Sequence, residues 1–160
     1  MASSQFYFRH GMSALLSALR KRQGKLHIVS AGVVGVIKES VEMLDSDAKD
    51  AVVYCGTQEE YDAKGTLVGF KEPTVTSQNK SSVITHEMLP GVKPGSNAIV
   101  MGDLCSDLLM IENLKLDTTV SVGFFCAREG ESLEDFKRNF DVLVTGDGNL
   151  DWVVDLVASV

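Results

Sequence analysis

Residues 98–107 read Ala-Ile-Val-Met-Gly-Asp-Leu-Cys-Ser-Asp, and this stretch decides the fold. Its apolar half predicts a buried strand that ends at Gly102, where a residue without a side chain lets the backbone turn. Asp103 then stands at the carboxyl end of the strand, and Asp107 starts the next helix close to it. Carboxylates at the carboxyl edge of a parallel sheet are hard oxygen ligands suited to Mg²⁺. We therefore expect a magnesium site formed by Asp103 and Asp107.

Strands and helices alternate on both sides of this stretch. The predicted strands are residues 26–30, 51–54, 67–70, 97–101, 119–125 and 142–145, and the predicted helices are 12–23, 33–44, 80–88, 108–113, 132–140 and 150–160. Such alternation favours an α/β fold, a three-layer Rossmann-like parallel sheet with helices on both faces. No internal repeat or linker divides the chain, so residues 1–160 are expected to form a single domain. Within it, residues 56–72 are polar and interrupted, which predicts a small hairpin or loop.

Composition narrows the classes of partner and compartment. A net charge of −7 argues against nucleic acid or an anionic membrane surface as a partner. No run of about 18 apolar residues predicts a membrane span, and the start lacks the pattern of a secretory signal. Three cysteines, Cys55, Cys105 and Cys126, do not make a disulfide framework. We expect buried free thiols and a cytoplasmic protein.

Two further places in the chain point to phosphate chemistry. Ser30 follows an apolar strand, and Ala31 and Gly32 lead into the next helix. A hydroxyl and free backbone N–H groups at such a place can hold a phosphate. Lys80 lies near the start of a predicted helix, and a lysine can neutralise charge on a transferring phosphoryl group. The ordinary alternatives are a helix cap for Ser30, a surface lysine for Lys80 and an N-terminal helix acid for Asp107.

In this order, the motifs resemble those of the haloacid dehalogenase-like phosphohydrolases, and more narrowly the cytosolic pyrimidine 5'-nucleotidases. The resemblance rests on four motifs, Ile28–Gly32, Gly65–Lys71, Asn79-Lys80 and Gly102–Leu108, and covers roughly residues 12–157. No single motif is specific, but four in the same order with matching intervals are much stronger. The resemblance implies Mg²⁺-dependent hydrolysis of nucleoside 5'-monophosphates, with pyrimidines preferred, in the cytoplasm.

The same resemblance assigns roles to the residues. Ser30, with Ala31 and Gly32, would bind the phosphate. Lys80 would be catalytic, because it would bind the phosphate, neutralise its charge and orient the nucleophile. Asp103 would bind the metal, and Asp107 would support it.

One part that the resemblance implies has no counterpart in the sequence. In the family, an Asp-x-Asp pair at the end of a central strand supplies the nucleophile and the acid, and this strand precedes the serine motif. The 29 residues before Ser30 contain no aspartate. We therefore expect a haloacid dehalogenase-like core that lacks the first (nucleophile) strand and most of the cap, with residues 56–72 as a hairpin near the cap.

Four consequences follow from this expectation. The chain would be the carboxyl-terminal part of a longer enzyme. It would carry only the phosphate and metal half of the site and would be inactive alone. By itself it would be poorly stable, or it would pair with another chain where the strand is missing.

Other aspartates and other functions stay open as alternatives. Asp45 and Asp47 have the Asp-x-Asp spacing but follow a helix, so a solvated turn is expected there. Asp147 and Asp151 repeat the Gly-Asp-x-x-x-Asp pattern, but a turn residue and an early helical acid explain them. The alternative function is a non-catalytic domain that binds Mg²⁺ or a nucleotide, or a remnant without activity. A receiver-like α/β domain ranks third.

Overall fold

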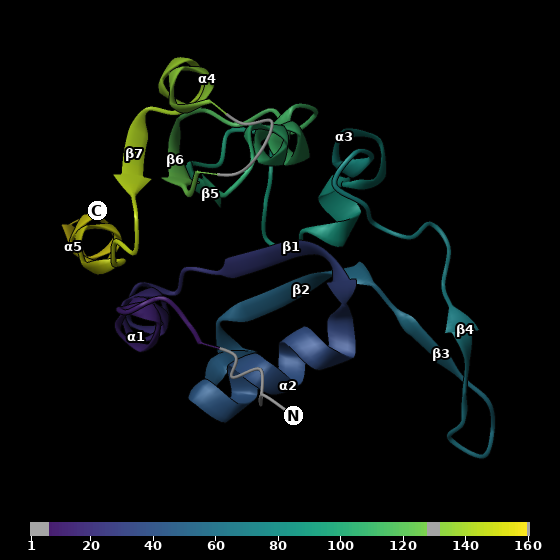
Figure 1. Cartoon of the computed structure of the whole chain (residues 1–160). Coiled ribbons are helices and arrows are strands. Elements are labelled where there is room, and N and C mark those ends of the chain that lie inside the picture. The colour runs from purple at the N-terminus through teal and green to yellow at the C-terminus, as the bar shows by residue number, and fades with distance from the viewer. Residues whose placement is uncertain (1–6, 128–131, 160) are drawn as a thin grey trace.

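The computed structural model describes residues 7–127 and 132–159 (Figure 1). Its strands are β1 (Leu26–Val33), β2 (Val52–Thr57), β3 (Glu59–Tyr61), β4 (Leu67–Phe70), β5 (Ala98–Gly102), β6 (Thr119–Phe125) and β7 (Val142–Thr145). Its α-helices are α1 (Met12–Arg22), α2 (Val34–Leu44), α3 (Lys80–Val83), α4 (Leu133–Asn139) and α5 (Asp151–Ser159). Three 3₁₀-helices complete the elements: η1 (Ala48–Asp50), η2 (His86–Met88) and η3 (Cys105–Ile111).

The parallel strands form two separate sheets. β1 pairs with β2, and β5, β6 and β7 pair in that order, with all neighbours parallel. The α/β prediction with parallel strands is confirmed, but the described strands make no single continuous sheet. In Figure 1, β1 and β5 lie on the facing sides of the two sheets, and the described chain places no strand between them.

Side-chain packing joins the two sheets. Leu15 of α1 packs in one core with Val122 of β6, and its neighbour Leu16 packs in a second core with Val52 of β2. A third core connects β2 through Cys55 with η2, η3 and the segments beside them, and its buried members are Cys55, Ile84, Leu89 and Leu114. Helix α1 therefore holds the two sheets together by two adjacent leucines.

Local signals explain where several elements begin and end. Helix α1 ends because Gln23 adopts a left-handed conformation (φ 55°) and the amide of Gly24 bonds to Leu19 O at 2.9 Å. Ser132 caps α4, since its hydroxyl accepts a hydrogen bond from the amide of Asp135 at 3.1 Å.

Other sequence predictions need correction. The predicted helix over residues 80–88 is only the single turn α3 followed by η2, because the backbone is extended at Ile84 and Thr85. The predicted helix after Asp107 is the 3₁₀-helix η3. Strand β1 runs through an irregularity to Val33, three residues beyond the predicted strand, whereas α2 starts within one residue of its predicted position. Cys126 is exposed rather than buried.

A hairpin projects from the end of β2 (Figure 1). It pairs β3 with β4 in antiparallel fashion, as expected for a hairpin within residues 56–72. Its large apolar side chains are exposed, namely Tyr61, Leu67, Val68 and Phe70. None of the helices in the described part of the chain is long and apolar enough to cross a membrane.

Candidate active site

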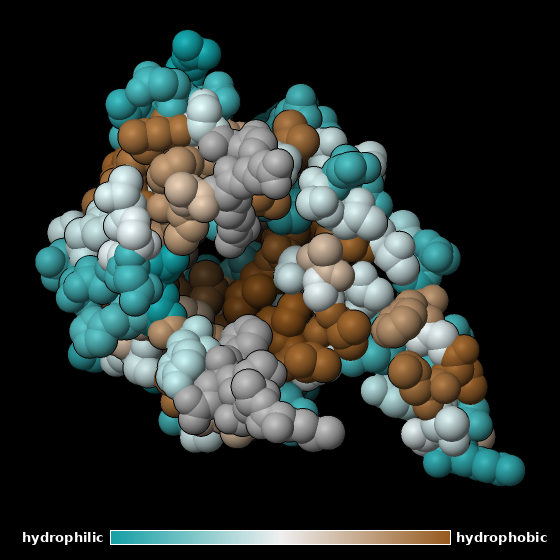
Figure 2. All heavy atoms as spheres, viewed as in Figure 1, coloured by the Kyte–Doolittle hydropathy of each residue, from teal (hydrophilic) through white to brown (hydrophobic). Residues whose placement is uncertain are grey.

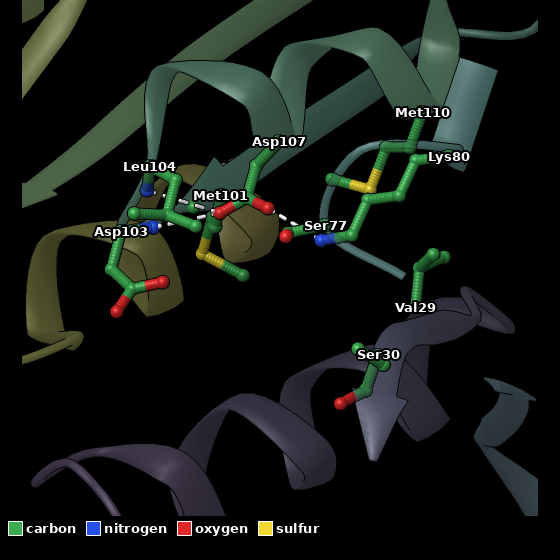
Figure 3. A pocket seen from close by; sticks show the side chains of 11 residues that line it. Val29, Ser30, Ser77, Lys80, Met101, Asp103, Leu104, Asp107 and Met110 are labelled. Atoms are coloured by element: carbon green, nitrogen blue, oxygen red, sulfur yellow. Dashed lines mark hydrogen bonds and ion pairs between the residues drawn. The ribbon is translucent and has the colours of Figure 1, made fainter. Parts of the chain in front are cut away.

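A pocket lies where the carboxyl ends of β1 and β5 meet (Figure 3). Its volume is about 300 Å³, and five of the six predicted site residues line it: Ser30, Ala31, Lys80, Asp103 and Asp107. The sixth residue, Gly32, lies next to the lining, and its amide donates a hydrogen bond to the hydroxyl oxygen of Ser30 at 3.0 Å. Residues from three distant segments of the sequence therefore converge at one place.

Lys80 and Asp107 form a buried ion pair in the lining of this pocket (Figure 3). Lys80 Nζ lies 2.5 Å from Asp107 Oδ1, and the two residues are only 7% and 6% exposed. A buried lysine needs such a partner, because an unpaired buried charge is costly. The alternative of a surface lysine is thereby excluded for Lys80.

Asp107 also shapes the turn that follows β5. Its Oδ2 accepts hydrogen bonds from the amides of Asp103 at 3.0 Å and Leu104 at 3.1 Å. A side chain at position 102 would collide with Asp107, since a Cβ built on Gly102 lies 2.5 Å from that side chain. The glycine of the motif is therefore needed for the close approach of Asp107 to the backbone.

Asn79 holds the loop that carries Lys80. Its Oδ1 accepts a hydrogen bond from the amide of Thr76 at 2.7 Å, and its Nδ2 donates one to Thr74 O at 2.9 Å. The loop is thereby closed on itself directly before Lys80. Sequence reasoning assigned Asn79 no contact of its own and missed this role.

On the β1 side, the structure corrects the expected phosphate cradle. Helix α2 begins at Val34 with Val33 as its N-cap, so Ser30 is not a helix cap. The amide of Gly32 already bonds to Ser30 Oγ. The amide of Gly35, in the first turn of α2, donates to Glu59 Oε1 at 3.0 Å. Of the expected cradle, the amide of Gly32 therefore has a partner within the chain, and so does the amide of Gly35 at the start of α2.

Asp103 differs from Asp107 in its surroundings. Its residue is exposed, and in Figure 3 its carboxylate points away from the Lys80–Asp107 pair. No group of three or more His, Cys, Asp or Glu suited to a metal occurs among the described residues. Mg²⁺ is commonly bound by one or two carboxylates together with water and substrate phosphate. Of the two predicted metal ligands, Asp103 is therefore the accessible carboxylate, whereas both oxygens of Asp107 accept hydrogen bonds within the chain.

Several lining residues were not anticipated from the sequence. Ser77 lies in the Asn79 loop and lines the pocket beside Lys80 (Figure 3). The apolar lining comes from Val29, Met101, Leu104 and Met110. The sequence alone did not predict that Ser77 lines the pocket, since its position depends on how the hydrogen bonds of Asn79 close the loop.

The other aspartates have structural roles, although Asp45 does not lie in the expected solvated turn, because its side chain is only 14% exposed. Asp45 follows α2 and forms an ion pair with Arg20 at 2.8 Å. Asp47 donates its amide to Asp45 Oδ1, as in a local turn. Asp151 is an acid in the first turn of α5.

The fold and the site define a class: an α/β protein in which a buried lysine lies against a carboxylate that follows the carboxyl end of a parallel strand. The whole of residues 1–160 matches the family described as Pyrimidine 5'-nucleotidase (UMPH-1). The chain belongs to the pyrimidine 5'-nucleotidase family, as the sequence motifs predicted.

Individual relatives agree with this family. The 7-methylguanosine phosphate-specific 5'-nucleotidase A of Xenopus laevis is 26% identical over 153 residues, which are 94% of this chain and 52% of that protein. The corresponding 5'-nucleotidase of Gallus gallus is 24% identical over 153 residues, 94% of this chain and 53% of that protein. The chain thus spans about half the length of the curated relatives it matches.

A solved structure shows the same fold. The crystal structure of cytosolic 5'-nucleotidase IIIB (cN-IIIB) bound to cytidine superposes with a TM-score of 0.76 at 18% identity. The match covers 94% of this chain and 52% of that one. The two sheets of this chain therefore have the same relative arrangement as the matching part of the solved structure, whose chain is about twice as long.

Proposed function

We propose that this chain carries the phosphate and metal half of an active site that hydrolyses nucleoside 5'-monophosphates to nucleoside and phosphate. The observation that carries the proposal is the convergence of Ser30, Lys80, Asp103 and Asp107 on one pocket. These groups offer one cation and a hydroxyl for the phosphate and carboxylates for a divalent ion. The reaction would take place in the cytoplasm.

Each side chain has a distinct role in this proposal. Ser30 donates its hydroxyl hydrogen to a phosphate oxygen from the β1 side, near Ala31 and Gly32. Lys80 neutralises phosphate charge and is kept in place by Asp107. Asp103 would bind Mg²⁺, with Asp107 supporting it, and the ion would add positive charge at the phosphate.

The base of the nucleotide is a separate matter. The family is described as pyrimidine 5'-nucleotidase, whereas the curated relatives are named for 7-methylguanosine phosphate. We propose a pyrimidine preference, and the direct competitor is 7-methylguanosine monophosphate. Turnover of both nucleotides by the completed enzyme distinguishes the two.

The first test of the site is binding, since the chain alone is proposed to be inactive. Calorimetric titration of the folded 160-residue protein with inorganic phosphate in the presence of Mg²⁺ should give binding that Lys80→Met weakens at least about tenfold. Lys49→Met, at an exposed lysine outside the pocket, is the matched control and should leave binding unchanged. Asp103→Asn should weaken Mg²⁺ binding.

Three results would count against the proposal. Equal phosphate affinity in the two lysine variants would remove Lys80 from the site. Turnover of cytidine or uridine monophosphate by the purified chain alone would show that it needs no further residues. Binding of Mg²⁺ or nucleotide without any turnover, even with the other half of the family fold supplied, would favour the non-catalytic alternative.

A further inference from the structure

Ser77 places a hydroxyl group at the pocket that has no role in the reaction proposed above. The residue lines the pocket together with Lys80 and Asp107. In Figure 3 it lies on the side of these two residues, across the pocket from Ser30, and Figure 2 shows the molecule hollowed between its two halves. Ser77 is exposed, so a ligand in the pocket can reach its hydroxyl. The pocket therefore has one serine on each of two opposite sides.

The Ser77 hydroxyl is not engaged elsewhere in the described chain. Within residues 7–127 and 132–159, no other group forms a hydrogen bond with it. The Ser30 hydroxyl, by comparison, already accepts a hydrogen bond from the amide of Gly32 at 3.0 Å. A serine hydroxyl offers one hydrogen as a donor. The hydroxyl hydrogen of Ser77 is thus available to a ligand.

The loop around Ser77 holds the residue in place before any ligand binds. On one side, the amide of Thr76 donates to Asn79 Oδ1 at 2.7 Å. On the other side, the amide of Gln78 donates to Thr76 Oγ1 at 3.3 Å. Val75 anchors the loop in the interior, since it is only 2% exposed. A donor fixed in this way loses little conformational freedom when it binds a ligand.

A bound phosphate can accept more hydrogen bonds than the residues assigned so far donate. A phosphate group has three strong acceptor oxygens. An ammonium has three N–H groups, and Asp107 accepts one of those of Lys80. The amides of Gly32 and Gly35 have partners within the chain. A further donor on the Lys80 side of the pocket would therefore add to phosphate affinity.

We propose that Ser77 is a phosphate-binding residue, whose hydroxyl donates to a terminal phosphate oxygen from the Lys80 side of the pocket. Ser30 would donate to another oxygen of the same phosphate from the β1 side. The inference rests on the proposed function, because it adds a residue to the same site. The ligand is a phosphate dianion, which inorganic phosphate and a nucleoside 5'-monophosphate both present.

Calorimetric titration of the folded 160-residue protein with inorganic phosphate, in the presence of Mg²⁺, tests the contact. Ser77→Ala should weaken binding about tenfold, because a hydrogen bond to a charged group is lost. Ser77→Thr keeps a hydroxyl and should bind phosphate more tightly than Ser77→Ala. Ser46→Ala, at an exposed serine outside the pocket, is the matched control and should bind like the unaltered chain.

Urea denaturation separates a ligand contact from a structural role. The Ser77 hydroxyl has no partner among the residues that the structure describes, so Ser77→Ala should leave the urea midpoint unchanged. Asn79→Ala, by contrast, should lower both the midpoint and the phosphate affinity, since the Asn79 side chain closes the loop. A lowered midpoint for Ser77→Ala would assign Ser77 a structural role and would overturn the inference.

The same titration with cytidine monophosphate shows which part of a nucleotide Ser77 contacts. A contact with the phosphate predicts that Ser77→Ala weakens the binding of inorganic phosphate and of cytidine monophosphate by the same factor. A loss confined to cytidine monophosphate would place Ser77 at the nucleoside and would contradict the assignment to phosphate.

Lys80→Met distinguishes failure of this inference from failure of the proposed function. If Lys80→Met weakens phosphate binding and Ser77→Ala does not, the assignment of Ser77 is wrong and the proposed function stands. If the unaltered chain binds no phosphate, both are wrong. Weaker binding in both variants, with an unchanged urea midpoint for Ser77→Ala, supports both.

Discussion

At the scale of single residues, Asn79 is the side chain whose contacts best explain how Lys80 is positioned. Both of its hydrogen bonds close the loop over Thr74–Thr76. We expect Asn79→Ala to lower the free energy of unfolding by about 1–3 kcal/mol, since each of the two hydrogen bonds contributes about 0.5–1.5 kcal/mol. Urea denaturation measures this, and phosphate titration should show weaker binding as well.

The neighbouring residue provides the control. Gln78 is exposed beside Asn79, so Gln78→Ala should change neither stability nor phosphate binding. If Asn79→Ala lost stability but bound phosphate as tightly as the unaltered chain, the loop would be structural only. Asn79→Asp keeps the acceptor for the amide of Thr76 and should fall between the two variants.

At the scale of elements, the carboxylate of Asp141, directly before β7, forms hydrogen bonds to Ser121 of β6. Asp141 Oδ2 accepts hydrogen bonds from the amide of Ser121 at 2.8 Å and from its hydroxyl at 2.7 Å. These bonds, the backbone one first, hold the pKa of the Asp141 carboxyl below its ordinary value. A depressed carboxyl pKa means that the unfolded chain binds the proton more readily than the folded one.

The pH dependence follows with a definite sign. The contribution of Asp141 is fully present above the ordinary carboxyl pKa and is lost as pH falls through the lowered value. Urea midpoints of the unaltered chain should therefore drop on going from about pH 6 to about pH 3, and Asp141→Asn should reduce this drop. Asp147→Asn, at an exposed loop carboxylate, is the control, and an equal effect of both substitutions would refute the assignment.

The elements also show where the sequence was and was not sufficient. The strands of the β5–β7 sheet were predicted within one residue, because apolar runs bounded by polar residues mark them clearly. The prediction of one helix over residues 80–88 was wrong for two reasons. Val83, Ile84 and Thr85 are β-branched, which disfavours a helix. In addition, the Ser82 hydroxyl donates a hydrogen bond to Asn79 O at 3.0 Å. There, local side-chain chemistry outweighed the apolar spacing.

For the whole molecule, motifs predicted which residues meet but not how they meet. The resemblance of the sequence motifs to the family predicted that Ser30, Lys80 and Asp107 lie in one site, and all three line the pocket. The direct ion pair between Lys80 and Asp107 and the closure of the loop by Asn79 depend on tertiary packing, which no spacing in the sequence records. The division of the parallel strands into two sheets was anticipated only as a gap between the strands of Ser30 and Asp103.

That division makes a last prediction about how the molecule unfolds. Leu15 is 2% exposed in the core of the β5–β7 sheet, and Leu16 is 0% exposed in the core of the β1–β2 sheet. Each substitution by alanine should cost about 2–5 kcal/mol. Because no backbone pairing within residues 7–127 and 132–159 connects the two sheets, we expect Leu15→Ala to speed amide exchange mainly in β6 and Leu16→Ala mainly in β2.

Native-state hydrogen exchange of the two variants provides the measurement, and each variant serves as the control for the other. If both variants speed exchange equally in β2 and β6, α1 and the third core couple the two halves into one cooperative unit.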